Sequence, residues 1–376
     1  MQIRAAVLNT MGTSRPYADS RPLTIETLEL HEPGDGEVRV AVRAAGLCHS
    51  DLSVVNGDRP RPTPMALGHE AAGVVEAVGH GVHDLAPGDH VVMVFVPSCG
   101  HCGPCAEGRP ALCEPGGAAN VAGTLLGGDR RIARADGSTV NHHLGVSAFA
   151  DHAVVSRRSL VKIDRDVPFE HAALFGCAVL TGVGAAVNTA GVVPGSSVAV
   201  VGLGGVGLNA LLGALVCGAE PVIAVDALDH KLALARELGA RDTFNATDEN
   251  AVEAIRAATG GGVDYAIELA GSERALELAY QITRRGGTTV TGGLAHPDRH
   301  IRLQQAGLVT EERTLKGSYV GSCIPGRDLP RYLRLFRHGR LPVDRLLSGT
   351  LPLDDINTAL DRLADGEAIR QVIRFD

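Results

Sequence analysis

The stretch VAVVGLGGVGLNA, residues 198–210, places Gly202, Gly204 and Gly207 in the spacing G-x-G-x-x-G between an apolar strand and a predicted helix. In this pattern the first glycine permits a tight turn, the second lets a pyrophosphate approach the backbone, and the third lets the helix pack closely on the strand. The N-terminus of such a helix presents free N–H groups and a partial positive charge to phosphate. The stretch therefore predicts a dinucleotide-binding domain.

A second apolar run, PVIAVDA at 221–227, ends in Asp226, about twenty residues beyond the glycines. A carboxylate at this position accepts hydrogen bonds from the adenosine ribose hydroxyls and repels a 2′-phosphate, and no arginine follows it to receive one. The sequence therefore favours NAD over NADP. The alternative, a glycine-rich turn in another kind of α/β sheet, is weaker because strand, loop, helix and acidic end all agree.

Three segments of the chain differ in their pattern of apolar residues. Residues 1–178 hold short β-branched runs separated by Gly and Pro, which predicts a mostly β domain. Residues 179–321 alternate strand-like and helix-like segments, which predicts a doubly wound parallel sheet with helices on both faces. Residues 322–376 contain two amphipathic helix candidates and a strand-like end, and we expect them to return to the first domain. The expected fold class is α/β.

The composition narrows the possible partners and locations. Lys and Arg number 35 against 43 Asp and Glu, a net charge of −8, and there is no long basic run, which argues against nucleic acid as a partner. The N-terminus lacks the apolar core of a signal peptide, and no segment offers eighteen uninterrupted apolar residues. We therefore expect no membrane association and a cytoplasmic location. In a reducing compartment, clustered cysteines are more often metal ligands than disulfides.

Half of the eight cysteines lie in SCGHCGPCAEGRPALCEP, residues 98–115. Their spacing, C-x2-C-x2-C-x7-C, lets one loop wrap four thiolates around Zn²⁺. The four ligands are Cys99, Cys102, Cys105 and Cys113. A closed shell of four thiolates leaves no coordination position for a substrate, so the loop predicts a structural zinc site. An iron–sulfur cluster, a redox dithiol or a disulfide pair remain alternatives, although the short spacing and Cys-Pro of bacterial ferredoxins are missing.

A second set of metal-ligand residues is scattered along the chain. Cys48 lies in GLCHSDL, His69 in ALGHEAAG and Cys177 in LFGCAVLTG. Each residue taken singly is explained as well by burial in a core. Together they supply one imidazole and two thiolates, the ligand set of a catalytic zinc that keeps a fourth position open.

The motifs G-L-C-H-S-D, G-H-E, C-x2-C-x2-C-x7-C, G-C-x3-T-G, G-L-G-G-V-G and a terminal I-R-Q-V-I occur in this order. In this respect the chain resembles, over essentially its whole length, the zinc-dependent alcohol dehydrogenases of the medium-chain dehydrogenase/reductase superfamily. The resemblance implies a GroES-like catalytic domain over 1–178 that carries both zinc sites, and a Rossmann domain over 179–321. The long segment between Cys113 and AFADHAVV is similar to that of the long branch, which includes the glutathione-dependent formaldehyde dehydrogenases and implies a homodimer.

The resemblance assigns roles around the catalytic metal. It implies that Cys48, His69 and Cys177 bind the catalytic Zn²⁺, with Glu70 behind the metal as an occasional alternative ligand. Asp51 would hold the second nitrogen of His69 and thereby fix its tautomer.

The family's proton relay and substrate pocket map less completely onto this chain. Ser50 stands where relatives have the hydroxyl that accepts the substrate proton. Relatives often continue the relay with a histidine three residues further on, and here Ser53 stands there. Phe95 matches a pocket-lining position, and a plain core aromatic explains it equally well.

The resemblance also implies contacts with the cofactor. His49 and Arg370 match positions that touch the pyrophosphate, Lys231 one on the adenosine ribose, and Val206 one against the nicotinamide. The cofactor-binding set is His49, Gly202, Gly204, Gly205, Val206, Gly207, Asp226, Lys231 and Arg370.

The resulting prediction is an enzyme with two Zn²⁺ per subunit that transfers hydride between an alcohol or aldehyde and NAD(H). One alternative is a thiol-dependent formaldehyde dehydrogenase, which would act on formaldehyde only when a thiol is present. A more distant one is a nucleotide-binding sensor that lost catalysis. Such a loss would leave the metal ligands and Ser50 free to drift, and all of them are present.

Overall fold

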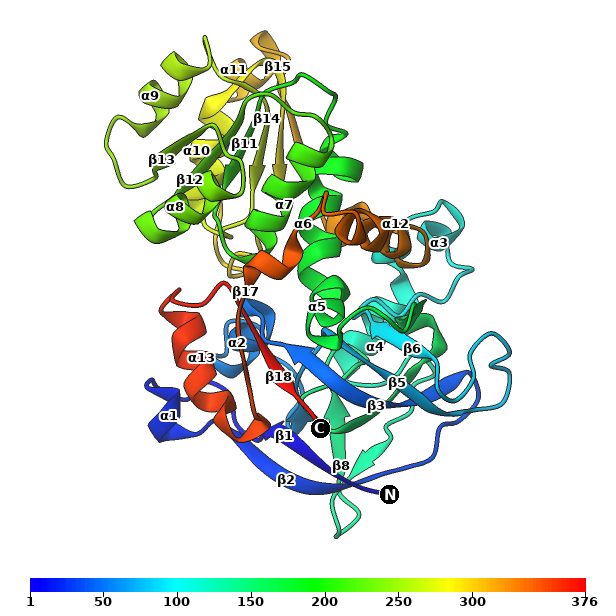
Figure 1. Ribbon diagram of the computed structural model, residues 1–376. Coiled ribbons are helices and arrows are strands. Elements are labelled where there is room, and N and C mark those ends of the chain that lie inside the picture. Colours follow the sequence, from blue (N-terminus) through cyan, green and yellow to red (C-terminus); the bar gives the residue numbers. More distant parts are fainter. The chain divides into compact units, whose positions relative to one another are not determined.

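A parallel sheet of six strands organises residues 178–323 in the computed structural model, which describes residues 1–376 (Figure 1). The strand order is β13-β12-β11-β14-β15-β16, and every neighbouring pair is parallel. The strands are β11 (Val198–Val201), β12 (Val222–Asp226), β13 (Asp242–Asn245), β14 (Val263–Glu268), β15 (Thr283–Thr291) and β16 (Thr314–Gly317). This order, with the reversal beside β11, confirms the predicted doubly wound fold.

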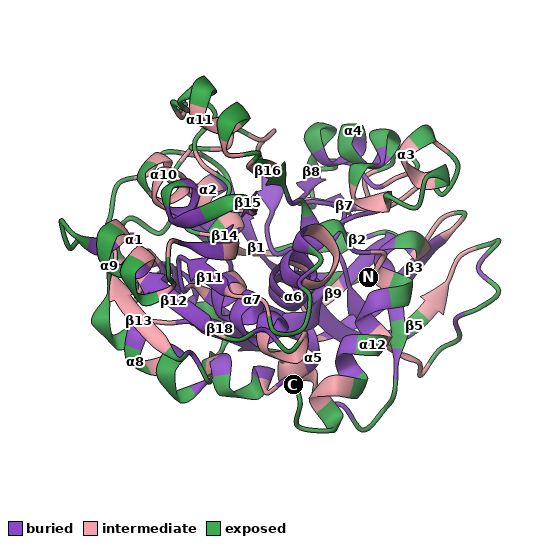
Figure 2. Ribbon diagram, turned by 90° about the horizontal axis from the view of Figure 1, so that it is seen from above, coloured by how far each residue is buried: buried purple, intermediate pink, exposed green.

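Helices cover both faces of this sheet because its central strands are apolar on both sides. Ala199 and Val201 of β11 pack in one cluster with Ile255 and Ile282 of two following helices. On the opposite face the helix after β11 passes close to Val200. The helices are α7 (Gly205–Val216), α8 (Asp229–Glu237), α9 (Ala251–Ala258), α10 (Glu273–Ile282) and α11 (Gln305–Thr310). Figure 2 shows the buried central strands and the more exposed outer helices, of which α11 buries no residue.

The remaining strands form a mostly β unit, as the sequence predicts. A small closed barrel has the order β1-β2-β7-β8-β4, and a second sheet has the order β10-β6-β5-β3-β18-β17 with β9 paired to β3. The barrel strands are β1 (Gln2–Leu8), β2 (Leu23–Leu30), β4 (Met65–Ala66), β7 (Ile132–Ala133) and β8 (Thr139–His142). The other strands are β3 (Glu37–Gly46), β5 (Ala71–Val78), β6 (His90–Met93), β9 (His152–Ser156), β10 (Leu160–Ile163), β17 (Leu347–Leu351) and β18 (Arg370–Arg374).

Short helices connect these strands. They are α1 (Tyr17–Ser20), α2 (His49–Val55), α3 (Gly103–Ala106), α4 (Glu114–Ala122), α5 (Phe169–Leu174) and α13 (Ile356–Ala364), and the second unit adds α6 (Leu180–Gly184). β18, close to the C-terminus, pairs antiparallel with β3. The end of the chain therefore completes the sheet of the N-terminal unit.

The C-terminal segment is divided between the two units. Residues 324–330 and 343–376 belong to the first unit with 1–177, whereas 331–342 belong to the second. This differs from the expectation that all of 322–376 returns to the first domain. The reason lies in α12 (Pro325–Arg337), because its Tyr332 hydroxyl accepts a hydrogen bond from Asn188 Nδ2 at 3.4 Å. Amphipathic spacing predicts a helix here but does not specify which core the helix covers.

One helical run, Phe169–Ala190, has the length and hydropathy of a membrane span. It contains 22 residues, its most apolar window has a mean hydropathy of 1.6, and 78% of that window is buried inside the protein. Such burial is typical of a helix in a protein core, so the run is weak evidence for a membrane span.

Candidate active site and metal centres

Cys48, His69 and Cys177 converge although they are far apart in the sequence. Cys48 caps the N-terminus of α2, His69 lies between β4 and β5, and Cys177 lies in the π-helical turn Phe175–Val179. Their ligand atoms lie within 4.8 Å of one another, and all three residues are buried. A π-helical turn in a helix is frequent at functional sites, because it moves a side chain out of the regular helical register. The fold thus assembles the predicted ligand triplet.

Asp51 orients two members of the triplet. Its Oδ1 lies 3.0 Å from His69 Nδ1, and its Oδ2 accepts a hydrogen bond from the Cys48 backbone N–H at 3.2 Å. The other nitrogen of His69, Nε2, is buried and has no hydrogen-bond partner within the protein. Since a buried polar atom without a partner costs about 1–3 kcal/mol, Nε2 fits a metal ligand. The residues present therefore fit Zn²⁺.

The charges within this cluster reinforce one another. A hydrogen bond from the Cys177 thiol lowers the pKa of Cys48 well below its usual value, although burial acts in the opposite direction. Burial alone would lower the pKa of His69, but the adjacent Asp51 carboxylate and Cys48 outweigh it and raise that pKa to about 10. Binding of Zn²⁺ at Nε2 would therefore release a proton from this imidazole. The Cys48 sulfur thus has thiolate character, the form that binds metal.

Glu70 and Arg370 form a buried ion pair beside the triplet. Glu70 is fully buried, Arg370 is 3% exposed, and the Arg370 guanidinium contacts Glu70 Oε1. A Cβ added at Gly46 would lie 2.3 Å from the same Oε1, so Gly46 leaves room for this carboxylate. The predicted contact of Arg370 with a cofactor pyrophosphate stays a prediction, as does metal binding by Glu70.

The predicted relay and pocket residues also lie near the metal ligands. Ser50 is half-buried on α2, directly after the exposed His49. The Ser53 hydroxyl donates to the His49 carbonyl at 2.7 Å, so its proton is engaged in a hydrogen bond with the backbone of α2. The Phe95 ring meets the His69 ring edge to face, with 5.3 Å between their centroids.

His143, which no sequence motif marks, lies in the same cluster. His143 is 1% exposed, and its Nδ1 lies 3.2 Å from Asp51 Oδ1. Its ring is nearly perpendicular to that of His69, with 5.5 Å between centroids. The only signal in the sequence is the pair His142–His143 after a strand, and nothing in that pattern distinguishes a core histidine from one at a metal site.

The four clustered cysteines also meet. All four thiols are free, and their sulfur atoms lie within 4.8 Å of one another. Backbone N–H groups of Cys99 and Gly116 donate to Cys113 Sγ at 3.1 and 3.3 Å, and that of Cys102 donates to Cys99 Sγ at 3.3 Å. A backbone N–H of His101 lowers the pKa of Cys99 to about 6, whereas desolvation raises that of Cys105 to about 12. The free thiols disfavour the disulfide alternative, and this donor set fits a tetrahedral Zn²⁺.

The glycine loop of the second unit has the backbone that its sequence predicts. Gly202 has a φ of +90° and follows β11 directly, and Gly204 caps the N-terminus of α7. A Cβ on Gly207 would lie 1.7 Å from the Gly202 carbonyl oxygen. Asp226 Oδ2 accepts the Leu203 N–H at 2.6 Å, so the carboxylate at the end of β12 also shapes the loop.

The remaining predicted cofactor residues are divided between the units. Gly205, Val206 and Lys231 belong to the second unit with the glycine loop, whereas His49 and Arg370 belong to the first. Their contacts with a cofactor stay predictions.

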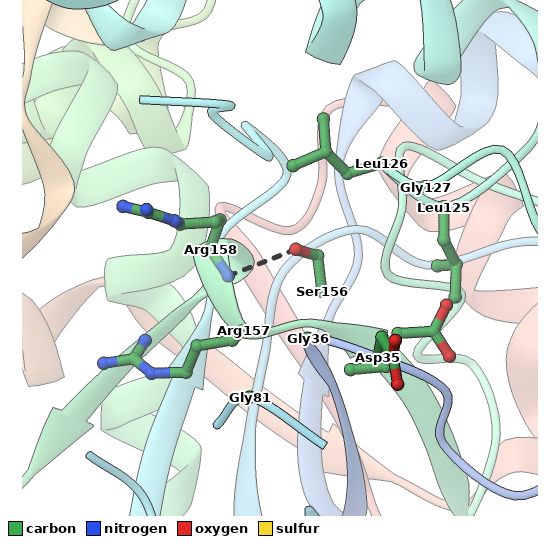
Figure 3. Close-up of a pocket in the computed structure, with 10 residues that line it drawn as sticks. Asp35, Gly36, Gly81, Leu125, Leu126, Gly127, Ser156, Arg157 and Arg158 are labelled. Carbon is green, nitrogen blue, oxygen red and sulfur yellow. Dashed lines mark hydrogen bonds between the residues drawn. The ribbon is translucent and has the colours of Figure 1, made fainter. Parts of the chain in front are cut away.

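A cavity of about 300 Å³ lies elsewhere in the first unit (Figure 3). Its lining residues are Asp35, Gly36, Glu37, Gly81, Leu125, Leu126, Gly127, Ser156, Arg157 and Arg158. Two of its charged residues are paired within the protein, Glu37 with Arg131 at 2.6 Å and Arg157 with Asp84. None of the predicted site residues lines it.

Comparisons with known proteins agree with this architecture. Residues 34–165 match the model of the alcohol dehydrogenase GroES-like domain, and residues 205–338 match that of the zinc-binding dehydrogenases. The chain is 39% identical to an NDMA-dependent alcohol dehydrogenase of Amycolatopsis methanolica, over 99% of each protein.

Solved structures agree as well. A benzyl alcohol dehydrogenase from Acinetobacter calcoaceticus is 34% identical over the whole of both chains, with a TM-score of 0.93. An alcohol dehydrogenase zinc-binding domain protein from Burkholderia ambifaria is 36% identical over 100% of this chain and 99% of that one, with a TM-score of 0.94.

The fold and site define a zinc-binding dehydrogenase with a nicotinamide cofactor. The chain belongs to the zinc-dependent alcohol dehydrogenases of the medium-chain dehydrogenase/reductase superfamily. It is therefore an oxidoreductase of the alcohol dehydrogenase type. The long dimeric branch stays a prediction.

Proposed function

We propose that the protein is an NAD-dependent dehydrogenase of primary alcohols and aldehydes with one catalytic and one structural Zn²⁺ per subunit. One observation carries the proposal. The ligand atoms of Cys48, His69 and Cys177 lie close together, and Nε2 of His69 has no hydrogen-bond partner within the protein. Three protein ligands of this type leave one coordination position for a substrate oxygen, whereas four thiolates leave none.

The chain's own residues divide the work of the reaction. Cys48, His69 and Cys177 would hold Zn²⁺, which would supply a Lewis acid for the substrate oxygen. Ser50 accepts the hydroxyl proton of the alcohol and passes its own proton to water or to the cofactor ribose, since Ser53 stands at the position of the next relay group. Asp51 holds the His69 tautomer that leaves Nε2 free for the metal. The glycine loop and the N-terminus of α7 bind the cofactor pyrophosphate and thereby orient the nicotinamide for hydride transfer.

The relatives suggest which substrates to test first. One similar structure is a benzyl alcohol dehydrogenase, and one similar protein is NDMA-dependent. Zinc-replete protein is assayed with benzyl and primary aliphatic alcohols, with NAD⁺, NADP⁺ or NDMA, and with formaldehyde in the presence and absence of glutathione. NAD⁺-dependent turnover of an alcohol without thiol is the expected result. Absence of turnover with every alcohol and aldehyde would refute the proposal.

The preference for NAD is expected to depend on Asp226. An Asp226→Ala variant loses charge-assisted hydrogen bonds of about 1.5–3 kcal/mol each, so kcat/KM for NAD⁺ is expected to fall about tenfold or more. The kcat/KM for NADP⁺ should fall less or rise, because the repulsion of the 2′-phosphate is removed. The Asp226→Asn variant is the control, since its amide oxygen can still accept the Leu203 N–H. A wild-type protein that prefers NADP⁺ would contradict the assignment.

The structural zinc is tested by Cys102→Ser. The variant is expected to lose about one zinc per subunit and to unfold roughly 5 °C or more below the wild type, because structural zinc contributes folding free energy directly. Metal analysis and thermal unfolding measure both effects. Cys217→Ser, at a half-buried thiol outside both clusters, is the matched control. Full stability and metal content in the Cys102 variant would refute the structural assignment.

We further infer a cytoplasmic homodimer. The long branch that the sequence resembles supports the dimer, and the clustering of four cysteines in metal-ligand spacing supports a reducing location. Sedimentation of the purified protein tests the assembly, and a monomer or tetramer would contradict it.

A further inference from the structure

One oxygen of Asp51 is shared by several groups. Oδ1 lies 3.3 Å from the Gly68 backbone nitrogen, 3.0 Å from His69 Nδ1 and 3.2 Å from His143 Nδ1. The side chains of Asp51, His69 and His143 are all buried, so water does not compete for the carboxylate. A second imidazole therefore approaches the same oxygen that orients the predicted zinc ligand.

The approach of His143 has a chemical consequence. His143 Nδ1 is buried and makes no hydrogen bond of good geometry within the protein, and the charged oxygen of Asp51, Oδ1, lies 3.2 Å from it. A nitrogen lone pair facing a carboxylate would be repelled, and an N–H is attracted. The tautomer of His143 with the proton on Nδ1 is therefore the favoured one.

The backbone holds His143 in place through a tight turn. Leu144 and Ser147 adopt the left-handed conformation, with φ of 51° and 52°. For residues other than glycine this costs of the order of 1–3 kcal/mol and persists only where the surroundings enforce it. The Ser147 hydroxyl accepts the His143 backbone N–H at 2.9 Å, which closes the turn.

The same turn is attached to the segment that precedes His69. The backbone N–H groups of Ala148 and Phe149 donate to the carbonyls of Gly68 and Leu67 at 3.1 and 3.0 Å. A Cβ on Gly68 would lie 2.4 Å from the Phe149 nitrogen, so the two segments are in direct backbone contact. The positions of His143 and His69 are thus linked by backbone as well as through Asp51.

We propose that His143 is a positioning residue of the catalytic metal site. Its N–H takes up part of the negative charge of Asp51 and fixes the direction from which that carboxylate holds His69. The inference rests on the proposed function, since it requires zinc at Cys48, His69 and Cys177. Loss of an outer partner of a metal-bound histidine typically costs about 10–100-fold in metal affinity, and a comparable loss is expected without His143.

The test uses the full-length protein loaded with Co²⁺, whose visible spectrum reports the ligand field. The difference between the spectra of the wild type and Cys48→Ser identifies the catalytic cobalt. His143→Leu is expected to shift this spectrum and to weaken cobalt binding about 10–100-fold in competition with a chelator. In His143→Asn the amide N–H can replace Nδ1–H, so this variant should have nearly the spectrum and the cobalt affinity of the wild type.

The adjacent His142 offers a matched control. It is fully buried, its Nε2 accepts the Arg131 backbone N–H at 3.0 Å, and the charges that act on it are those of Arg130 and Arg131. His142→Leu should lower thermal stability and leave the catalytic cobalt spectrum unchanged. An equal spectral shift in His142→Leu, or an unchanged spectrum and affinity in His143→Leu, would overturn the inference.

A second variant, Ser147→Ala, tests the same inference through the turn that holds His143. If His143→Leu does not fold, Ser147→Ala loosens the turn without touching Asp51, and it should shift the spectrum in the same direction by a smaller amount. An unaltered spectrum and affinity in that variant would overturn the inference. A wild-type protein that binds no cobalt at Cys48 would instead refute the proposed function itself.

Discussion

Replacement of Cys48 or Cys177 by serine is expected to lower kcat by about 10³-fold or more, because a metal Lewis acid contributes several kcal/mol and each 1.36 kcal/mol is a factor of ten. The two sulfurs belong to the three-ligand cluster, so either change removes a thiolate from the catalytic site. The four-cysteine loop lies at other positions and should keep its zinc. Turnover, metal content and NAD affinity are measured on the same preparation, and the metal content should fall by about one zinc per subunit.

Two controls separate a catalytic role from a structural one. Cys323→Ser changes a buried thiol outside both metal clusters, and it should leave kcat unchanged. The Cys48 and Cys177 variants themselves should stay folded by circular dichroism and still bind NAD, since the glycine loop lies in the other unit. Retention of wild-type kcat in either variant would show that the reaction does not need this metal site.

The second large effect is expected at Gly207. A Cβ there would lie 1.7 Å from the Gly202 carbonyl oxygen, and a backbone carbonyl cannot rotate away as a side chain can. Gly207→Ala should therefore displace the phosphate loop, lower thermal stability by about 1–3 kcal/mol and reduce NAD affinity by roughly 100-fold. Thermal unfolding and calorimetric titration with NAD⁺ measure the two losses.

Gly204→Ala is the matched comparison in the same loop. A Cβ on Gly204 would have no atom within 4 Å, and its φ of −70° suits any residue. Its stability should therefore equal that of the wild type, while NAD affinity falls because the methyl group stands where the pyrophosphate approaches. If Gly204→Ala binds NAD⁺ as tightly as the wild type, the second glycine does not face the cofactor and the predicted binding mode is wrong.

The sequence predicts the second unit well because the signals there are local. The alternating strand-like segments predicted over 179–321 form the six-stranded sheet, and the glycine spacing places its turn correctly at Gly202. A continuous apolar run between helical segments favours a buried parallel strand wherever the other strands lie. The four-cysteine loop was predictable for the same reason, since its ligands span only residues 99–113.

Residues whose contacts are distant in sequence were harder to predict. The amphipathic pattern of α12 predicts a helix, yet only tertiary contacts, among them the bond from Asn188 to Tyr332, assign 331–342 to the second unit. Arg370 was associated with the cofactor on resemblance alone, and the structure adds its ion pair with Glu70. Such pairings depend on how strands and turns pack, which short-range spacing does not encode.

The sequence by itself determined the α/β class, the dinucleotide loop, the four-thiolate cluster and, through ordered motifs, the family. Only the tertiary structure decided that Cys48, His69 and Cys177 meet, that His69 Nε2 is left without a protein partner, and that His143 shares Asp51. The physical reason is the range of the interactions. Turn and metal-loop geometry follow from neighbouring residues. The buried cluster is drawn from the start of α2, the loop between β4 and β5, the turn after β8 and a π-helical turn, so it exists only once their backbones have packed.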